Sequence, residues 1–241
     1  MASKAEARTS SLSQLAYARI SAAIVEGRLD LGEPLSETEL ARALGMSKAP
    51  VRNAIKELEV RGLVEIVPQS GTYVFSPSER QIIELSEFRA MLEEQGLLLS
   101  MDRDREALLA ELGGIVEEMR RLWAVHAIAE MKKCDTRFHL AFIRHAGNAY
   151  LMDAYADVSL LVEALRYRFM DTAVYRNRAY EEHLDMHGLL AKGQVQRAVR
   201  LLRGHVERTK EFHARASWSN GRASRRVYRE REYASILNAG M

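Results

Sequence analysis

The sequence is poor in several features that mark other classes of protein. It has one cysteine among 241 residues, which excludes an internal disulfide. It has no apolar run long enough to span a bilayer, and its first residues lack the apolar core of a signal peptide. Aromatic residues make up only 7%, which disfavours an all-β fold. These absences predict a soluble, cytoplasmic protein without a membrane partner.

The net charge is also small, at +2, which is too little to indicate a nucleic-acid partner by itself. Any DNA contact must therefore come from basic residues placed locally. The chain does contain 47% hydrophobic residues and only four prolines, with Leu, Ala, Glu and Arg dominant. This composition permits a packed core and favours helix. We therefore expect a mainly α fold, with an N-terminal winged helix-turn-helix followed by an all-α antiparallel helical bundle.

Two short helices joined by a glycine turn are predicted near the N-terminus. Ser36 has the position of an N-cap, and Glu39 follows it at the spacing of a capping box. The helix that begins there stops at Gly45, and the next begins at Ser47. The strand-like runs LVEIV and GTYVF follow, joined by PQSG, which predicts a hairpin. Residues 11–75 are therefore predicted to form a winged helix-turn-helix.

The second of these helices has the position of a DNA-recognition helix. Its first turn is where groove contacts usually arise, and the tip of the wing can reach the DNA backbone or minor groove. The alternative is that its basic residues are simply solvated. The DNA-binding candidates are Thr38, Ser47, Lys48, Arg52, Gln69 and Gly71.

The run LSETELARALGMSKAPVRNAIKELEVRGLV resembles the DNA-binding domain of the GntR family of bacterial regulators. That family usually has Arg at the positions of Thr38 and Lys48, and Thr at the position of Ala49, whereas Arg52 keeps the pattern. Lysine cannot reproduce the bidentate contact of arginine to guanine. The resemblance therefore implies binding to double-stranded operator DNA but no particular operator sequence.

The rest of the chain is read as a linker, a helical domain and a tail. Residues 1–10 are predicted to be a flexible arm and 76–79 a linker. Residues 80–215 are predicted to be an all-helical domain, and 216–241 a basic C-terminal tail. The expected helices are 78–101, 104–123, 126–146, 149–172, 178–191 and 194–215, with a break at Asn177 between the fourth and the fifth.

Four polar residues fall on apolar faces of these helices. Asp135 and His139 are one helical turn apart, and His183 and His205 lie at similar distances before and after Gly193. In an antiparallel helix pair both histidines then rise roughly 15–18 Å above the turn and can face each other. One carboxylate and three imidazoles suit a divalent ion such as Zn, Ni, Mn or Co. The alternative is a buried hydrogen-bond network without metal.

The remaining histidines are less well placed for this site. His187 competes with His183 for the same role, but its height in the helix matches no polar residue of the next helix. His126, His145 and His213 lack a partner of this kind and are assigned no role as ligands.

The runs DTRFH and EHLDMHGLLAKGQVQRAVRLLRGH resemble the FCD ligand-binding domain of the FadR-type branch of the GntR family. In that branch an Asp and three His bind a metal ion in an all-helical bundle, and the matching positions are Asp135, His139, His183 and His205. The resemblance implies a homodimer that binds a palindromic operator and responds to a small organic acid.

Two further residues are effector-binding candidates. Arg89 lies on an apolar helix face, where a buried cation needs an anion. It can pair with Glu93 one turn later or meet an effector carboxylate, and the family's Arg in this helix matches it. Asn148 is most simply a helix cap, and it is also retained as an effector-binding candidate.

The favoured function is thus a metal-dependent, ligand-responsive transcription regulator, and a repressor rather than an activator. One alternative is a metalloenzyme whose open metal site activates water, although no further carboxylate or histidine is placed as a general base. The other is a DNA-binding protein whose helical domain only dimerises.

Overall fold

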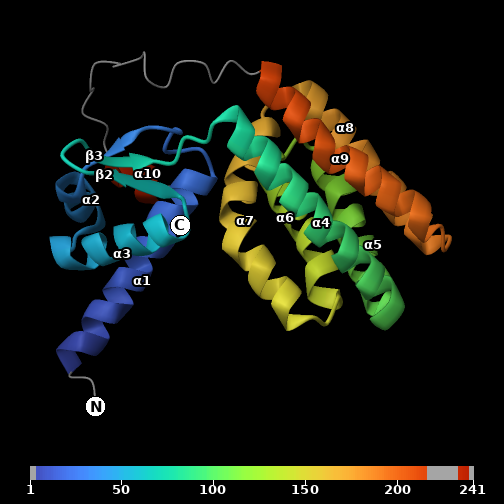
Figure 1. Cartoon of the computed structure of the whole chain (residues 1–241), viewed down its shortest axis with the longest axis horizontal. Coiled ribbons are helices and arrows are strands. Elements are labelled where there is room, and N and C mark those ends of the chain that lie inside the picture. Colours follow the sequence, from blue (N-terminus) through green and yellow to red (C-terminus); the bar gives the residue numbers. More distant parts are fainter. Residues whose placement is uncertain (1–3, 216–232, 239–241) are drawn as a thin grey trace. The chain divides into compact units, whose positions relative to one another are not determined.

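The computed structural model of the protein describes residues 4–215 and 233–238 and divides into two compact units. The first contains the N-terminal helices, a small sheet and the C-terminal helix, and the second contains the six long helices (Figure 1). The expected mainly α fold is confirmed. Among the described residues, no helix combines the length and apolarity needed to cross a membrane.

The first unit is a winged helix-turn-helix, as expected. Its helices are α1 (Lys4–Val25), α2 (Glu37–Leu44) and α3 (Lys48–Val60), and its strands are β1 (Pro34–Leu35), β2 (Val64–Val67) and β3 (Gly71–Val74). The strands form one antiparallel sheet in the order β1-β3-β2, in which β1 was not predicted from the sequence. Helix α1 begins at Lys4, so residues 4–10 are helical where a flexible arm was expected.

Local sequence explains the turn between α2 and α3. The Ser36 side chain accepts a hydrogen bond from the Glu39 amide at 3.3 Å and so caps the start of α2. Gly45 ends this helix with φ of 65°, a left-handed conformation that costs glycine little. In the wing, Gln69 also has a positive φ, of 60°, at the turn that joins β2 to β3.

The C-terminal helix α10 (Tyr233–Asn238) belongs to this first unit and packs against α1 and α2. The predicted tail, 216–241, thus ends in a packed helix. Residues 216–232 and 239–241 of that tail lie outside the described part of the chain.

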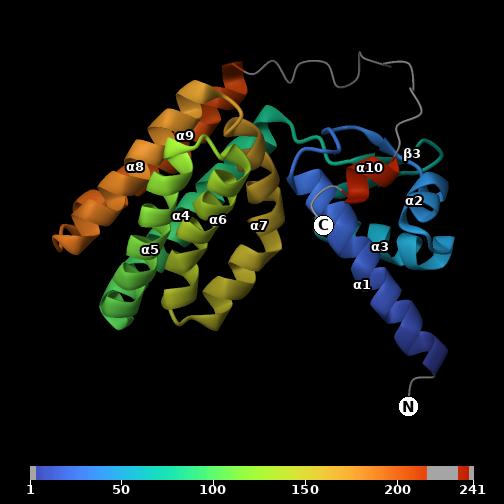
Figure 2. The same ribbon diagram turned by 180° about the vertical axis from the view of Figure 1, so that it is seen from behind.

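The second unit is the expected helical bundle. It consists of α4 (Glu79–Arg103), α5 (Arg105–Ala124), α6 (Ile128–His145), α7 (Ala149–Phe169), α8 (Ala173–Ala191) and α9 (Val195–Arg215). Helix α4 packs against α6, α7 and α9, while α5 packs against α6 and α8, and α8 against α9 (Figure 2). Asn148 accepts a hydrogen bond from the Leu151 amide at 3.2 Å and caps α7.

The predicted break at Asn177 is wrong, because the chain turns earlier. Helix α7 ends at Phe169, and Arg176 donates to the carbonyl of Met170 at 2.7 Å, which satisfies a terminal carbonyl of α7. Asn177 lies inside α8, where its side chain is exposed to water.

A close contact between α4 and α6 positions the helix that carries Asp135 and His139. A Cβ atom added to Gly96 would lie 3.0 Å from the Phe142 carbonyl oxygen, so only glycine allows this approach. One turn later, Ser100 Oγ donates to that same oxygen at 2.6 Å. These contacts hold the backbones of α4 and α6 together.

Candidate metal centre and nucleic-acid interface

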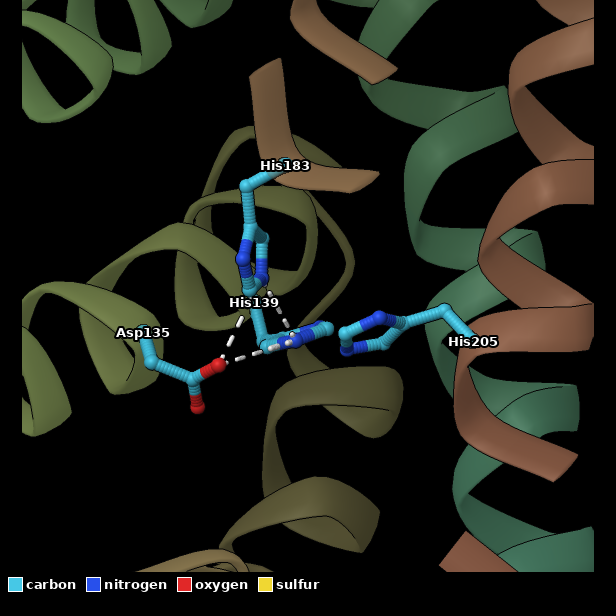
Figure 3. Close-up of side chains that lie close together, drawn as sticks. All are labelled: Asp135, His139, His183 and His205. Atoms are coloured by element: carbon cyan, nitrogen blue, oxygen red, sulfur yellow. Dashed lines mark hydrogen bonds and ion pairs between the residues drawn. The ribbon is translucent and has the colours of Figure 1, made fainter. Parts of the chain in front are cut away.

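The structure brings together the four residues singled out as metal ligands. Asp135 and His139 come from α6, His183 from α8 and His205 from α9, and their side chains point toward a common centre (Figure 3). All four are at most 2% exposed. Their candidate ligand atoms all lie within 4.8 Å of one another.

The distances within this cluster are close to those around a metal ion. His139 Nε2 and His183 Nε2 are 3.2 Å apart, and Asp135 Oδ1 lies 3.5 Å from His183 Nε2 and 4.0 Å from His139 Nε2. Two ligand atoms that each lie about 2.1 Å from one ion are at most about 4.2 Å apart. The three separations given above lie within this limit, whereas the widest pair, within 4.8 Å, would have to close by up to about 0.6 Å for all four atoms to coordinate one ion.

Two buried carboxylates orient the imidazoles. His139 Nδ1 donates to Glu93 Oε2 at 2.7 Å, and His205 Nδ1 donates to Glu182 Oε2 at 2.8 Å. A neutral imidazole with its proton on Nδ1 has a free lone pair on Nε2. This carboxylate–histidine arrangement is common around metals, because it fixes the ring and raises its basicity as a ligand.

His205 distinguishes between the two interpretations of the cluster. In a pure hydrogen-bond network, the Nε2–H of His183 could satisfy Asp135 or His139. His205 Nε2, however, is buried and has no hydrogen-bond partner. A buried acceptor without a partner is costly, and a cation at the centre would satisfy it. The cluster therefore fits a divalent metal ion better than a network without one.

The protonation states also fit a metal. Burial lowers the pKa of His139 to about 4, and it holds the pKa of His183 well below its ordinary value. Burial alone would raise the pKa of Asp135, but the Arg166 guanidinium and the nearby imidazoles keep that pKa well below its usual range. At neutral pH Asp135 is thus a carboxylate and His139 and His183 are neutral imidazoles, which are the forms that bind metals.

Two buried arginines lie next to the cluster. Arg89 Nε donates to Glu93 Oε1 at 2.7 Å, and Arg166 Nε lies 3.3 Å from Asp135 Oδ2. Arg89 Nη2 and Arg166 Nη1 are nevertheless buried without a hydrogen-bond partner. Both side chains line a cavity of about 20 Å³ between α4 and α7. Its other lining residues are Leu85, Ser86, Val162, Leu165 and Phe169.

Glu182 and Arg166 were not predicted from the sequence as part of this site, and Glu93 was predicted only as a partner of Arg89. A signal for Glu182 did exist, since it lies eleven residues before Gly193 and His205 lies twelve after it. Similar distances from the turn predict that His183 and His205 face each other, and by the same reasoning they predict that Glu182 faces His205. Arg166 had no comparable signal, because it reaches Asp135 from a helix whose packing the sequence does not reveal.

The other histidines take different roles. His187 packs beside Gly113 of α5, outside the cluster. His145, to which the sequence assigned no role as a ligand, lies outside the cluster and between two carboxylates: its Nδ1 lies 2.6 Å from Asp104 Oδ2, and its Nε2 lies 2.8 Å from Glu111 Oε2. The sequence did not reveal these two partners, because both lie on or next to α5, more than thirty residues away.

The predicted DNA-binding residues lie at the surface of the first unit. Arg52 is partly engaged, because its Nε and Nη2 donate to Glu37 Oε2 at 3.2 and 3.1 Å. This pair orients Arg52 and leaves Nη1 outside the contact. The candidates with exposed side chains or backbone are Thr38, Ser47, Lys48, Arg52, Gln69 and Gly71.

Comparisons with known families cover both units. Residues 12–74 match the family described as bacterial regulatory proteins, gntR family, and residues 84–208 match the FCD domain. Together the two matches account for most of the described chain.

Curated relatives of the chain are transcriptional repressors. The chain is 31% identical to a probable D-xylose utilization operon transcriptional repressor of Paenarthrobacter nicotinovorans, over 76% of this chain and 80% of that protein. It is 25% identical to the transcriptional repressor RspR of Escherichia coli K12, over 84% of this chain and 89% of that protein. A solved structure of a GntR regulator from Rhodococcus sp. RHA1 has the same fold, with a TM-score of 0.73 at 21% identity, covering 87% of this chain and 99% of that one.

Proposed function

This chain belongs to the GntR family of bacterial regulatory proteins and carries an FCD domain, and from this starting point we propose that it is a ligand-responsive repressor. In our proposal it binds a palindromic operator as a homodimer, and a small carboxylate bound in the helical unit changes its affinity for DNA. Transcription regulation itself is common to the family and its curated relatives, which are not enzymes. The metalloenzyme alternative is therefore set aside.

A divalent metal ion would bind beside the proposed effector site, at the cluster that Arg166 contacts through Asp135. Asp135, His139, His183 and His205 would hold it through one oxygen and three nitrogens, and Zn, Ni and Mn are the candidates. When bound, the ion would link α6, α8 and α9 and offer an open position to a carboxylate oxygen. The observation that supports a metal ion here is His205 Nε2, which is buried and has no hydrogen-bond partner.

The single observation that carries the effector proposal is the pair of buried guanidinium groups with spare donors. Arg89 Nη2 and Arg166 Nη1 face no hydrogen-bond acceptor, although both are buried beside the metal cluster. Guanidinium groups bind carboxylates strongly in such surroundings. Asn148 is not part of this proposed effector site, because its side chain caps α7.

The cavity between the arginines is too small for most acids. Its volume of about 20 Å³ has room for roughly one water molecule. A larger acid must therefore displace side chains of α4 or α7 when it enters. Such a displacement is how ligand binding would alter the arrangement of the bundle and, through the dimer, the spacing of the two recognition helices.

The homodimer is supported by an apolar patch on α4. Phe88 is 37% and Met91 59% exposed, one turn apart on the outer face of this helix. Exposed apolar side chains that cluster in this way favour self-association. Two identical recognition helices related by two-fold symmetry require a palindromic operator.

The test of this proposal is a thermal-shift and DNA-release screen on metal-loaded, full-length protein. DNA fragments are first selected from the chain's own genome, and small mono- and dicarboxylates are then titrated. We expect at least one acid to raise the melting temperature and change DNA affinity, and Arg89→Gln to abolish both effects. Arg80→Gln is the control, because Arg80 lies on the same helix with its side chain 88% exposed.

The results of this screen distinguish the proposed effector response from the remaining alternative, a helical unit that only dimerises. If DNA binds but no acid changes either readout, the helical unit only dimerises, and the effector proposal fails. If Asp135→Ala retains as much metal as the parent protein, in measurements by mass spectrometry, the metal assignment fails while DNA binding stands.

A further inference from the structure

The short helix α10 packs against α1 and α2 of the first unit, which contains the winged helix-turn-helix. Tyr233 and Leu237, one turn apart, are 6% and 1% exposed, whereas Ala234 and Ser235 between them are exposed. The buried edge packs against α1 and α2. Helix α10 is thus amphipathic, and its apolar side is part of the core of this unit.

Polar contacts anchor both ends of α10. At its start, Tyr233 Oη donates to the Pro34 carbonyl at 3.2 Å. At its end, Arg19 Nη1 donates to the Leu237 carbonyl at 3.2 Å, and Arg28 donates to the Ile236 carbonyl. The last carbonyls of a helix have no partners within it, and cations are favourable there. Two arginines of the first unit therefore cap the helix from outside.

Helix α10 is too short to be stable by itself. It has six residues, and isolated helices of that length do not form in water because nucleation is unfavourable. Its helical form thus depends on the packing against α1 and α2 and on the contacts of Arg19 and Arg28. This dependence is typical of a peptide that folds onto a binding surface.

We propose that the segment Tyr233–Leu237 is a docking peptide that fastens this same chain onto the surface formed by α1 and α2. Helix α9, which carries His205, is thereby joined to the DNA-binding unit by a second connection besides residues 76–78. The inference does not require the metal or the effector, and it therefore stands or falls separately from the proposed function.

The first test is hydrogen exchange on the full-length protein. Tyr233→Ala combined with Leu237→Ala is expected to speed amide exchange in α2 and in the C-terminal half of α1 by at least about tenfold, because these helices lose a buried partner. Exchange in α5 and α6 should not change. Arg19→Gln, which leaves the sequence of α10 unchanged but removes one of its capping contacts, should act in the same direction. Ala234→Ser is the control, since Ala234 is exposed.

The second test supplies the peptide separately. A fluorescent peptide of residues 228–241 should bind the chain that ends at residue 231, and the peptide with both alanine substitutions should bind at least about tenfold more weakly. A segment that belongs to the same chain as its binding surface can act at an effective concentration of up to roughly millimolar. Absence of saturable binding up to that concentration, or unchanged exchange in the double variant, overturns the proposal.

A third measurement identifies which copy supplies the peptide. A photoactivatable residue at position 236 is introduced, and isotopically heavy and light chains are mixed before irradiation. Cross-links to α1 within one isotope label support docking within one chain. Cross-links between the labels show that the peptide comes from a second copy, which overturns the assignment to the same chain.

Discussion

His139 Nδ1 lies 2.7 Å from Glu93 Oε2, and both side chains are completely buried. The other oxygen of Glu93 accepts from Arg89 at 2.7 Å and from Tyr155 at 3.2 Å. One carboxylate thus joins a candidate metal ligand on α6 to a candidate effector residue on α4. Effector binding at Arg89 and metal binding at His139 are therefore expected to be coupled.

Glu93→Gln tests this link. The substitution keeps the shape of the side chain but removes the charge that orients His139, so we expect metal affinity to fall by about 10- to 100-fold. A competition titration with a chromophoric chelator measures the affinity. Glu94→Gln is the matched control, because Glu94 pairs with Arg203 and not with the cluster. Equal affinities in the two variants would mean that Glu93 does not support the metal.

Replacing Gly96 and replacing Gly114 with alanine are expected to change the free energy of unfolding in opposite directions. A Cβ at Gly96 would lie 3.0 Å from a backbone oxygen of α6, so Gly96→Ala should lower the free energy of unfolding by about 1–3 kcal/mol. Gly114 lies in α5 with nothing within 4 Å of the added atom, so Gly114→Ala should raise it by about 0.5–1 kcal/mol. Urea denaturation of both variants checks the signs. A stabilising Gly96→Ala would contradict the close approach of α4 and α6.

His145 should make the stability of the bundle depend on pH. Partial burial lowers its pKa, but hydrogen bonds to Asp104 and Glu111 outweigh this effect, and the net pKa is raised. Only the protonated ring can donate to both carboxylates. The contribution to stability is therefore complete below the unfolded-state pKa of about 6.5, and it is lost as the pH rises through the raised folded-state pKa.

The measurement is urea denaturation of the parent protein and His145→Gln at several pH values. Because Asp104 is half exposed, solvent screening limits the difference to about 0.5–1 kcal/mol below pH 6.5, and we expect it to shrink toward zero in alkaline solution. A difference that grows with rising pH would show that His145 is neutral in the folded protein.

Lys48→Ala should weaken DNA binding. Lys48 is exposed in the first turn of α3, where a cation can contact phosphate or a base edge. We expect a loss of about 1–3 kcal/mol in binding free energy, and a smaller dependence of affinity on salt if the contact is to phosphate. Fluorescence anisotropy on a selected fragment measures both. Lys192→Ala, at an exposed position between α8 and α9, should leave DNA affinity unchanged.

The sequence by itself determined the features that depend on neighbouring residues. Ser36 and Gly45 set the bounds of α2 through a cap and a left-handed turn, and both operate within a few residues of chain. His183 and His205 were predictable as facing residues, because a tight turn fixes the relative height of two adjacent helices.

Only the tertiary structure decided the contacts between segments far apart in the chain. The pairing of Glu93 with His139 spans 46 residues, and that of Tyr233 with Pro34 spans 199. Helical periodicity tells which side of a helix is buried, but not which other helix or loop covers that side. The carboxylates that orient the histidines and the surface that holds α10 therefore follow from packing, which no local pattern encodes.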